Sequence, residues 1–318
     1  MPNADLPRPN AATPSLEARI SRNQQETWQR LIMPADDKAG TSPLVVSSPH
    51  SGRVYPASFL DQAQLPLASL RLVEDCGLDI LLGCNPMPAP VLLAEFPRCF
   101  VDLNRHADDL DDAMFSGFTK ATTSRWICSH YQRAGLGVIP ARAFNQQLIY
   151  DGQLEAAEVE WRLGQFYHPW HASLADLLEQ ARHNSSMQQD SSAGGGQALL
   201  LDIHSMPSSL HDLAADIILG NRHGATTEPW LLDAAMAFFM REGLVVKCNS
   251  PFAGGHITRH YGKPEAGVMA LQIEINRQLY LDEQQLILKP GWHELATILN
   301  RFCRRMDEVM RRHQPASR

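Results

Sequence analysis

The chain has 318 residues, of which 44% are hydrophobic and 20% are charged, and its formal net charge is −7. This composition is typical of a globular protein with a sizeable core. The acidic balance argues against a nucleic-acid binder, which would present a basic face. No apolar run reaches the length of about 18 residues that a membrane span requires.

Residues 1–15 are polar and rich in proline, asparagine and alanine, and we expect them to be disordered. They lack the basic start and apolar core of a signal peptide. The six cysteines form no CxxC pair, so we interpret them as reduced thiols in a cytoplasmic protein. Residues 16–318 are expected to form a single α/β domain.

Strand-length apolar runs alternate with helical periodicity along the chain. The first half predicts a helix over 16–31, a strand over 44–48, a helix over 66–83 and short strands over 91–95 and 99–103. The second half begins with a predicted helix over 153–183, kinked at Pro169, and a flexible loop over 184–197. A strand ending at His204, a strand over 215–219, a helix over 229–242 and a strand over 244–248 are predicted next. The last predicted elements are a polar hairpin or loop over 254–262, a strand over 268–276 and a helix over 292–312. This alternation indicates an α/β sheet covered by helices on both faces.

Two histidines stand where buried strands are expected to end. His50 follows the run at 44–48, and His204 ends the run that begins at Leu199. In open α/β sheets, ligands and chemistry collect at the carboxyl ends of the strands. Hydrolytic zinc sites commonly take two histidines and one carboxylate and leave a fourth position for water. We therefore consider both histidines metal-ligand candidates, with Glu74 or Asp75 as the third ligand, although a single histidine is more often structural.

Glu274 lies between Ile273 and Ile275 in an apolar strand. A carboxylate in such a place is rarely buried without a partner. One interpretation is an ion pair with Arg277 or another arginine. The other is a general base, whose pKa burial would raise.

Four arginines follow apolar or glycine-rich stretches, and the guanidinium group matches a carboxylate in a bidentate way. They are Arg105, Arg222, Arg259 and Arg277. Several of them together would indicate a substrate that bears carboxylates, whereas each alone would be an ordinary ion pair. Asn104 precedes Arg105 and could donate its amide to a substrate. The chain carries no GxSxG serine motif and no glycine-rich phosphate loop.

Seven short stretches, taken in order over about residues 44–282, resemble the N-formylglutamate amidohydrolase family. They are SPHSG at 48–52, EDCGLD at 74–79, VDLNR at 101–105, DIHSMP at 202–207, GGHIT at 254–258, HYGKP at 260–264 and LQIEINR at 271–277. Two departures from the family pattern lie in one expected substrate loop: His256 stands where tyrosine is common, and Arg259-His260 precedes Tyr261 where an acidic residue is common.

The resemblance implies a mixed, mostly parallel sheet between helices, as in zinc exopeptidases and amidases. It also implies hydrolysis of a small molecule, N-formyl-L-glutamate, to formate and L-glutamate in histidine degradation. On this basis His50, Asp75 and His204 bind zinc or another divalent metal, with Glu74 as the alternative carboxylate. Glu274 becomes the general acid/base, and Arg105 with Asn104 becomes the carboxylate clamp. The alternatives are a related zinc amidase or carboxypeptidase, and a binding protein without catalytic activity.

Overall fold

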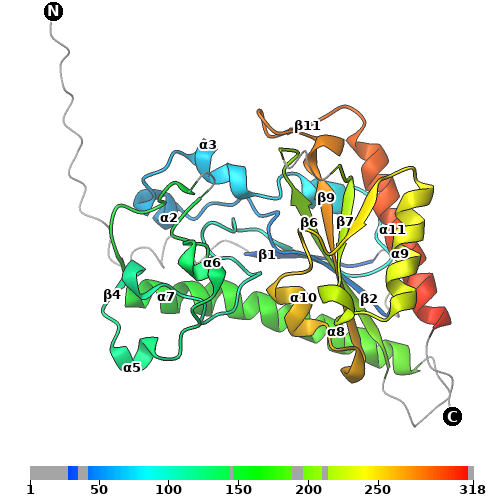
Figure 1. Ribbon diagram of the computed structural model, residues 1–318, viewed down its shortest axis with the longest axis horizontal. Helices are drawn as coiled ribbons and strands as arrows, with labels where there is room; N and C mark the ends of the chain where they lie inside the picture. Colours follow the sequence, from blue (N-terminus) through cyan, green and yellow to red (C-terminus); the bar gives the residue numbers. More distant parts are fainter. Residues whose placement is uncertain (1–27, 35–41, 144–145, 188–195, 210–213, 314–318) are drawn as a thin grey trace, which may run out of the picture.

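The computed structural model describes residues 28–34, 42–143, 146–187, 196–209 and 214–313 (Figure 1). Its centre is a seven-stranded sheet in the order β1-β3-β2-β6-β9-β7-β8. The strands in that order are Gln29–Ile32, Val91–Ala94, Leu44–Ser48, Ala198–Met206, Val268–Asn276, Ile217–Gly220 and Val246–Cys248. The sheet is mixed and mostly parallel, because β1 runs antiparallel to β3 and β7 antiparallel to β9. The predicted fold class is therefore confirmed.

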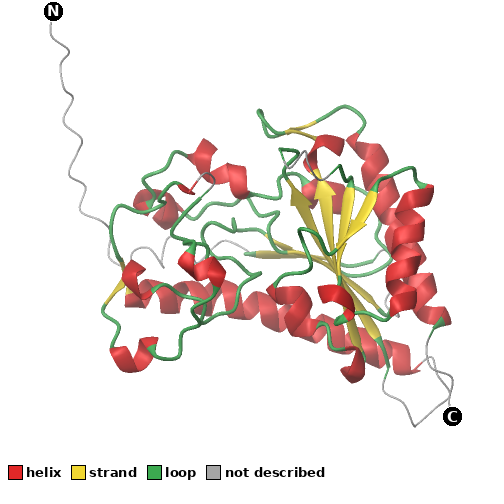
Figure 2. Ribbon diagram, viewed as in Figure 1, coloured by secondary structure: helices red, strands yellow, loops and turns green. Residues whose placement is uncertain are grey.

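Helices cover both faces of this sheet, as Figures 1 and 2 show. One face packs against α4 (Leu78–Gly83), α9 (Pro229–Arg241) and α11 (Trp292–Arg312). The other face packs against α8 (His168–Met187) and α10 (His256–Tyr261). Helix α7 (Ala156–Arg162) precedes α8 and contributes to the same hydrophobic cluster. The side chains of β6 alternate between the two cores, with Leu199 and Leu201 on one face and Leu200 on the other. A strand that is buried on both faces has a near-continuous apolar run, and the runs that begin at Leu44 and Ala198 made β2 and β6 recognisable in the sequence.

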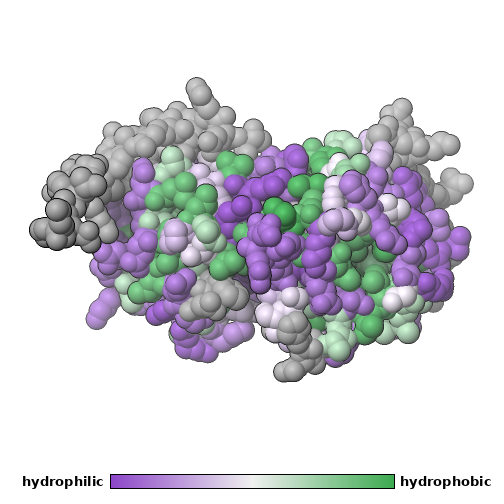
Figure 3. All heavy atoms as spheres, turned by 90° about the horizontal axis from the view of Figure 1, so that it is seen from above, coloured by the Kyte–Doolittle hydropathy of each residue, from purple (hydrophilic) through white to green (hydrophobic). Residues whose placement is uncertain are grey.

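The remaining elements lie outside the central sheet and its covering helices. These smaller elements are α2 (Ala57–Gln62), α3 (Leu67–Leu70), α5 (Lys120–Thr123), α6 (His130–Arg133), β4 (Phe115–Ser116), β5 (Leu154–Glu155), β10 (Leu281–Asp282) and β11 (Ile287–Leu288). Figure 1 shows α2, α5, α6 and β4 grouped on one side of the sheet. In the view from above, hydrophobic areas of the surface are divided by hydrophilic ones (Figure 3). No helix among the described residues is long and apolar enough to cross a bilayer.

Several predicted elements are confirmed with small shifts of their ends. The predictions at 44–48, 91–95, 215–219, 229–242, 244–248, 268–276 and 292–312 correspond to β2, β3, β7, α9, β8, β9 and α11. The long helix predicted from 153 is present as α7 and α8, joined by a π-helical turn over Leu163–Tyr167. This turn ends just before Pro169, which lacks the backbone N–H that a regular helix needs.

The prediction of one continuous helix over 66–83 is wrong, because the structure has a break in the middle of this segment. Helix α3 and a 3-10 turn over Arg71–Val73 come first, and α4 begins only at Leu78. Gly77 has a φ of 84°, and a Cβ there would lie 2.7 Å from Leu288 Cδ2. Only glycine fits such a position readily. The resulting break leaves Glu74 in an extended conformation and Asp75 outside both helical segments.

Three further predictions need correction. Residues 29–32 form strand β1 rather than the end of a helix, because they pair with β3. Residues 99–103 form turns rather than a strand, since Phe100 N donates to Pro97 O and Asp102 N to Val138 O. The predicted loop at 254–262 contains helix α10, whose Ile257 packs into the core.

Three predictions fall wholly or partly on residues that the structure does not describe. The disordered segment 1–15 and the helical prediction for 16–27 lie outside the described residues. So does 188–195, most of the predicted loop at 184–197. Helix α8 continues to Met187, past the expected start of that loop.

A buried arginine holds the turns that lead to the strand ends. Arg162 Nε donates to Glu158 Oε1 at 2.9 Å, and its Nη1 donates to Phe100 O at 3.2 Å. Both side chains are almost fully buried. We expect Arg162→Met to lower the free energy of unfolding by about 3–5 kcal/mol, because the substitution removes one member of a buried ion pair. Urea denaturation measures this, and Arg305→Gln in an exposed pair on α11 should stay within about 0.5 kcal/mol. If the Arg162→Met variant were as stable as the unmodified protein, the stabilising role of Arg162 would be contradicted.

Candidate metal centre and active site

The functional side chains converge at one edge of the sheet because neighbouring parallel strands end there. Strand β2 pairs with β6 through Ser47 and Asp202, and β6 pairs with β9 through His204 and Glu274. His50 lies two residues beyond the end of β2. The strand-end rule thus brings His50, His204 and Glu274 to the same place, as expected.

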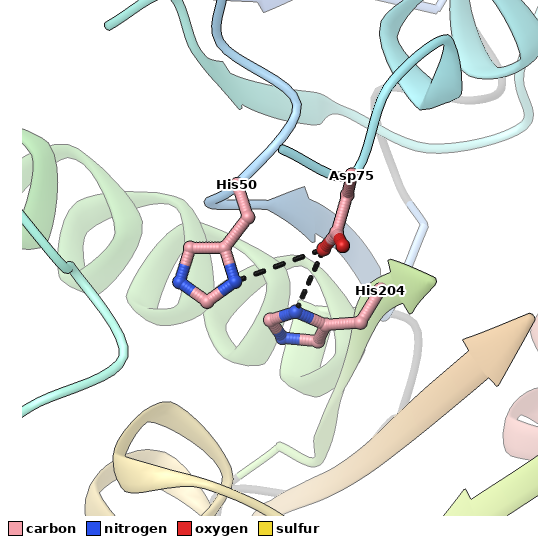
Figure 4. Close-up of side chains that lie close together, drawn as sticks. All are labelled: His50, Asp75 and His204. Carbon is pink, nitrogen blue, oxygen red and sulfur yellow. Dashed lines mark hydrogen bonds and ion pairs between the residues drawn. The ribbon is translucent and has the colours of Figure 1, made fainter. Parts of the chain in front are cut away.

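Two histidine rings face one carboxylate in the centre of this edge. His204 Nδ1 lies 3.2 Å from Asp75 Oδ2, and His50 Nδ1 lies 3.7 Å from the same oxygen (Figure 4). All three residues are at least 97% buried. Their ligand atoms lie within 4.8 Å of one another. Among the described residues this is the one group of three or more such side chains with that geometry.

A second carboxylate holds the far nitrogen of each ring. His50 Nε2 lies 2.8 Å from Asp102 Oδ1, and His204 Nε2 lies 2.9 Å from Asp202 Oδ2. Metal-binding histidines usually donate their other ring N–H to such a carboxylate, which fixes the tautomer and the ring orientation. The Nδ1 atoms are then left as electron-pair donors that face Asp75.

The site passes a direct test of fit for a divalent metal. His50 Nδ1 is buried and makes no hydrogen bond among the described residues, an arrangement that is costly without a partner. Two imidazole nitrogens and one carboxylate are the donor set of a hydrolytic zinc centre. The same donors also accept manganese, cobalt or iron.

The electrostatics of the centre favour an ionised Asp75. Burial opposes its charge, but the neighbouring His204 and His50 rings hold the pKa of the Asp75 carboxyl well below its usual range. Glu274 differs, because burial raises its pKa to about 7 while the nearby His204 partly offsets this rise. Gln272 Nε2 donates to Glu274 Oε1 at 2.9 Å and orients the carboxyl.

Glu74, the alternative carboxylate, does not join the cluster. Its Oε1 accepts a hydrogen bond of 2.6 Å from Tyr55 and lies 3.3 Å from Arg71 Nε. The helix break therefore directs Asp75 to the histidines and Glu74 to a separate ion pair.

The expected substrate-binding residues are not all brought together. Arg105 and Arg277 line a cavity of about 420 Å³ that also contains Asp75, His204 and Glu274. Arg222 lines a neighbouring cavity of about 260 Å³ together with Asn104, and Arg105, His204 and Glu274 line both cavities. Arg259 is exposed on α10 and lines neither cavity.

Arg277 does not form the ion pair with Glu274 that the sequence left open. Its Nε donates to Ser205 Oγ at 3.0 Å, and its Nη2 lies 3.3 Å from Asp75 Oδ1. The guanidinium therefore supports Asp75 from outside the cluster and leaves Glu274 facing the cavity.

Helix α10 reaches the site through its first turn. Ile257 N donates to Asn104 Oδ1 at 2.8 Å, and Gly255 N donates to Gln272 Oε1 at 2.8 Å. His256 itself lies 3.4 Å from the Tyr167 hydroxyl, and burial lowers its pKa to about 3. His256, which departs from the family pattern, therefore contacts the site only indirectly. Its chain neighbours Gly255 and Ile257 make the direct contacts.

Sequence reasoning missed four residues that shape the centre. They are Arg98, Asp102, Asp202 and Gln272. Asp202 stands two positions before His204 on the same strand face, and Asp102 lies in the VDLNR stretch. Both aspartates could therefore have been predicted from the sequence as site residues. Arg98 Nη2 donates to Asp102 Oδ2 at 2.8 Å, and no sequence pattern marks it.

We expect Asp102→Asn to weaken metal binding by about 10- to 100-fold, because His50 loses the carboxylate that fixes its tautomer. Titration of the purified protein with a competing chelator measures this. Asp307→Asn on α11, which removes a carboxylate paired with Arg311, is the matched control and should bind metal normally. Unchanged affinity in the Asp102 variant would exclude its role behind His50.

Comparison with known proteins agrees with this geometry. The family model described as N-formylglutamate amidohydrolase matches residues 42–281. A protein of Pseudomonas aeruginosa named N-formylglutamate deformylase is 33% identical over 258 residues, which cover 78% of this chain and 85% of the relative. A protein of the same name from Pseudomonas putida is 29% identical over 77% of this chain and 84% of its own length.

A solved structure supports the same assignment. The crystal structure of N-formylglutamate amidohydrolase from Ralstonia eutropha JMP134 superimposes with a TM-score of 0.80 at 32% sequence identity. The match covers 90% of this chain and 99% of that one. The resemblance that was recognised from seven short stretches is confirmed over most of the chain. The chain belongs to the N-formylglutamate amidohydrolase family.

Proposed function

We propose that this protein is a metal-dependent amidohydrolase that cleaves N-formyl-L-glutamate to formate and L-glutamate. The observation that carries the proposal is the buried His50–Asp75–His204 group, with Glu274 on the adjacent strand, in a chain of this family. The names of the relatives supply the substrate, and the donor set favours zinc.

His50, Asp75 and His204 would hold the metal, which when bound supplies Lewis-acid polarisation of a carbonyl and lowers the pKa of water. Asp102 and Asp202 keep the two rings in position. Glu274 takes a proton from the attacking water and delivers it to the amide nitrogen as the C–N bond breaks. A pKa of about 7 suits a group that must both accept and release a proton near neutral pH.

Asn104 and Arg105 are assigned to the substrate carboxylate nearest the scissile bond. Arg105 is buried, and its Nε and Nη1 donate to the backbone carbonyls of Leu136 and Asn104. Its guanidinium also lies 3.7 Å from the centroid of the Tyr131 ring. These contacts fix the guanidinium beside the cavity before substrate arrives, which reduces the entropy lost on binding.

We place the reaction in the cytoplasm, as a step of histidine degradation. All six cysteines are free, which is the state expected in a reducing compartment. The pathway follows from the proposed substrate and not from any contact in the site.

Product analysis tests the substrate assignment. Purified protein is incubated separately with N-formyl-L-glutamate, N-acetyl-L-glutamate and an acyl-dipeptide, and formate and free amines are quantified. We expect equal amounts of formate and L-glutamate from the first substrate and much slower release from the others. Cleavage of the dipeptide without cleavage of N-formyl-L-glutamate would instead favour the related amidase or carboxypeptidase activity.

A further inference from the structure

The larger of the two cavities at the site contains an arginine, Arg142, that has no role in the proposed mechanism. Four arginines line this cavity: Arg98, Arg105, Arg142 and Arg277. The proposed substrate carries two carboxylates, and Asn104 with Arg105 provides for only one of them. The other three arginines are therefore candidates for the second carboxylate.

Two of these three candidates already have a carboxylate partner within the protein. Arg98 Nη2 donates to Asp102 Oδ2 at 2.8 Å, and Arg277 Nη2 lies 3.3 Å from Asp75 Oδ1. Both partners are almost fully buried. Moving either guanidinium to a substrate would take a cationic partner away from a buried carboxylate, which is costly.

Arg142 is different because its charge has no carboxylate within 4.0 Å among the described residues. Its Nη1 donates to the backbone carbonyl of Gln146 at 2.7 Å, and that bond leaves the other guanidinium donors available. An unneutralised guanidinium at a cavity wall is a site for an anion, and a planar carboxylate matches its fork.

The position of Arg142 is fixed by its backbone and by its stem. Arg142 N donates to Gly135 O at 3.1 Å, and Arg142 forms an isolated antiparallel bridge with Leu148. The stem lies so close to Gly135 that a Cβ there would be 2.9 Å from Arg142 Cγ and Cδ. Gly135 also has a φ of 74°. The arginine is therefore held at the cavity before a ligand binds.

The cavity that contains Arg142, Asp75 and His204 has walls that suit a short aliphatic chain. Apolar side chains line the same cavity: Leu72, Val73, Leu136, Pro140, Met206 and Phe252. Methylene groups gain free energy on such a wall, and a carboxylate at their end needs a cation. This combination matches the side chain of glutamate.

We propose that Arg142 binds the side-chain carboxylate of the substrate and sets the selectivity for an acidic N-acyl amino acid. This inference rests on the proposed function, because it takes N-formyl-L-glutamate as the substrate. Arg222 is the competing residue, since its Nη1 donates only to Gly254 O among the contacts described, at 3.1 Å, in the smaller cavity. Arg222 is exposed, and ion pairs in solvent contribute little.

The test compares two substrates of nearly equal shape, N-formyl-L-glutamate and N-formyl-L-glutamine. Their kcat/KM values are measured for the unmodified protein and for Arg142→Gln, Arg142→Lys and Arg222→Gln. Arg133→Gln is the matched control, because Arg133 is exposed, donates to a backbone carbonyl and lines neither cavity.

We expect Arg142→Gln to lower kcat/KM for N-formyl-L-glutamate by about 100-fold, mainly through KM, as loss of a charge-assisted hydrogen bond predicts. The loss for N-formyl-L-glutamine should be much smaller, so the preference for the acid collapses. Arg142→Lys should retain part of the preference, and Arg133→Gln all of it. An equal loss for both substrates, or a collapse in Arg222→Gln instead, would overturn the proposal.

A binding measurement separates this proposal from the proposed function. Calorimetric titration with L-glutamate and with L-glutamine requires no turnover. Tighter binding of L-glutamate that is lost in Arg142→Gln supports the role of Arg142 even if no formyl substrate is cleaved. Absence of cleavage by the unmodified protein would contradict only the proposed function. Equal binding of both amino acids by the unmodified protein would overturn the role of Arg142.

Discussion

Replacement of Glu274 by glutamine is expected to lower kcat for N-formyl-L-glutamate by about 1,000-fold, the size typical of losing a general acid/base. The amide has nearly the shape of the carboxyl and can still bond to Gln272, which donates to Oε1 at 2.9 Å. The variant should therefore fold and bind metal like the unmodified protein. Steady-state kinetics and elemental analysis of the same sample provide both readouts.

Glu294→Gln, in the first turn of α11, is the control for a change of one carboxylate distant from the site. Its kcat should be unchanged. Full activity of the Glu274 variant would remove this residue from the mechanism. Low activity together with loss of metal would instead assign Glu274 to the metal-binding group.

Replacement of His204 by alanine is expected to give protein that purifies with little bound metal. The substitution removes one of the three side chains that would bind the metal directly. Loss of a residue that only supports a ligand typically lowers metal affinity by about 10- to 100-fold, and the loss here should be larger. Elemental analysis after dialysis against metal-free buffer measures the content. His293→Ala, an exposed histidine on α11, should retain metal fully.

The same measurement decides between the two neighbouring carboxylates. Asp75→Asn should lose metal as His204→Ala does, whereas Glu74→Gln should keep it, because Glu74 pairs with Tyr55 and Arg71 instead. Normal metal content in Asp75→Asn, or loss in Glu74→Gln, would move the third ligand.

The sheet and two of the three proposed ligands, His50 and His204, could be predicted from the sequence because short apolar runs mark the strands that carry them. A strand buried on both faces has a near-continuous apolar run. Such runs marked β2, β6 and β9 and placed His50, His204 and Glu274 near their ends. The choice of Asp75 over Glu74 came from family resemblance. The break in the helix at Gly77 could not be predicted from the sequence, because the apolar residues keep helical spacing across it.

Other parts of the site depend on contacts between distant segments. Strand β1 exists because Gln29–Ile32 pair with β3, and tertiary pairing of this kind overrides local helical preference. Arg98 and Arg142 reach the cavity from turns whose hydrogen bonds join distant residues, as Asp102 N does with Val138 O. The polar stretch at 254–262 hid a helix because only Ile257 within it is a deeply buried apolar residue.

The most direct measurement is formate release from N-formyl-L-glutamate by purified protein, assayed before chelator treatment, after it, and after zinc is restored. We predict that activity is lost with the chelator and recovered with zinc, and that His204→Ala protein is not recovered at the same zinc concentration. Formate release that continues at the full rate in protein shown to be free of metal would contradict a catalytic metal held by His50, Asp75 and His204.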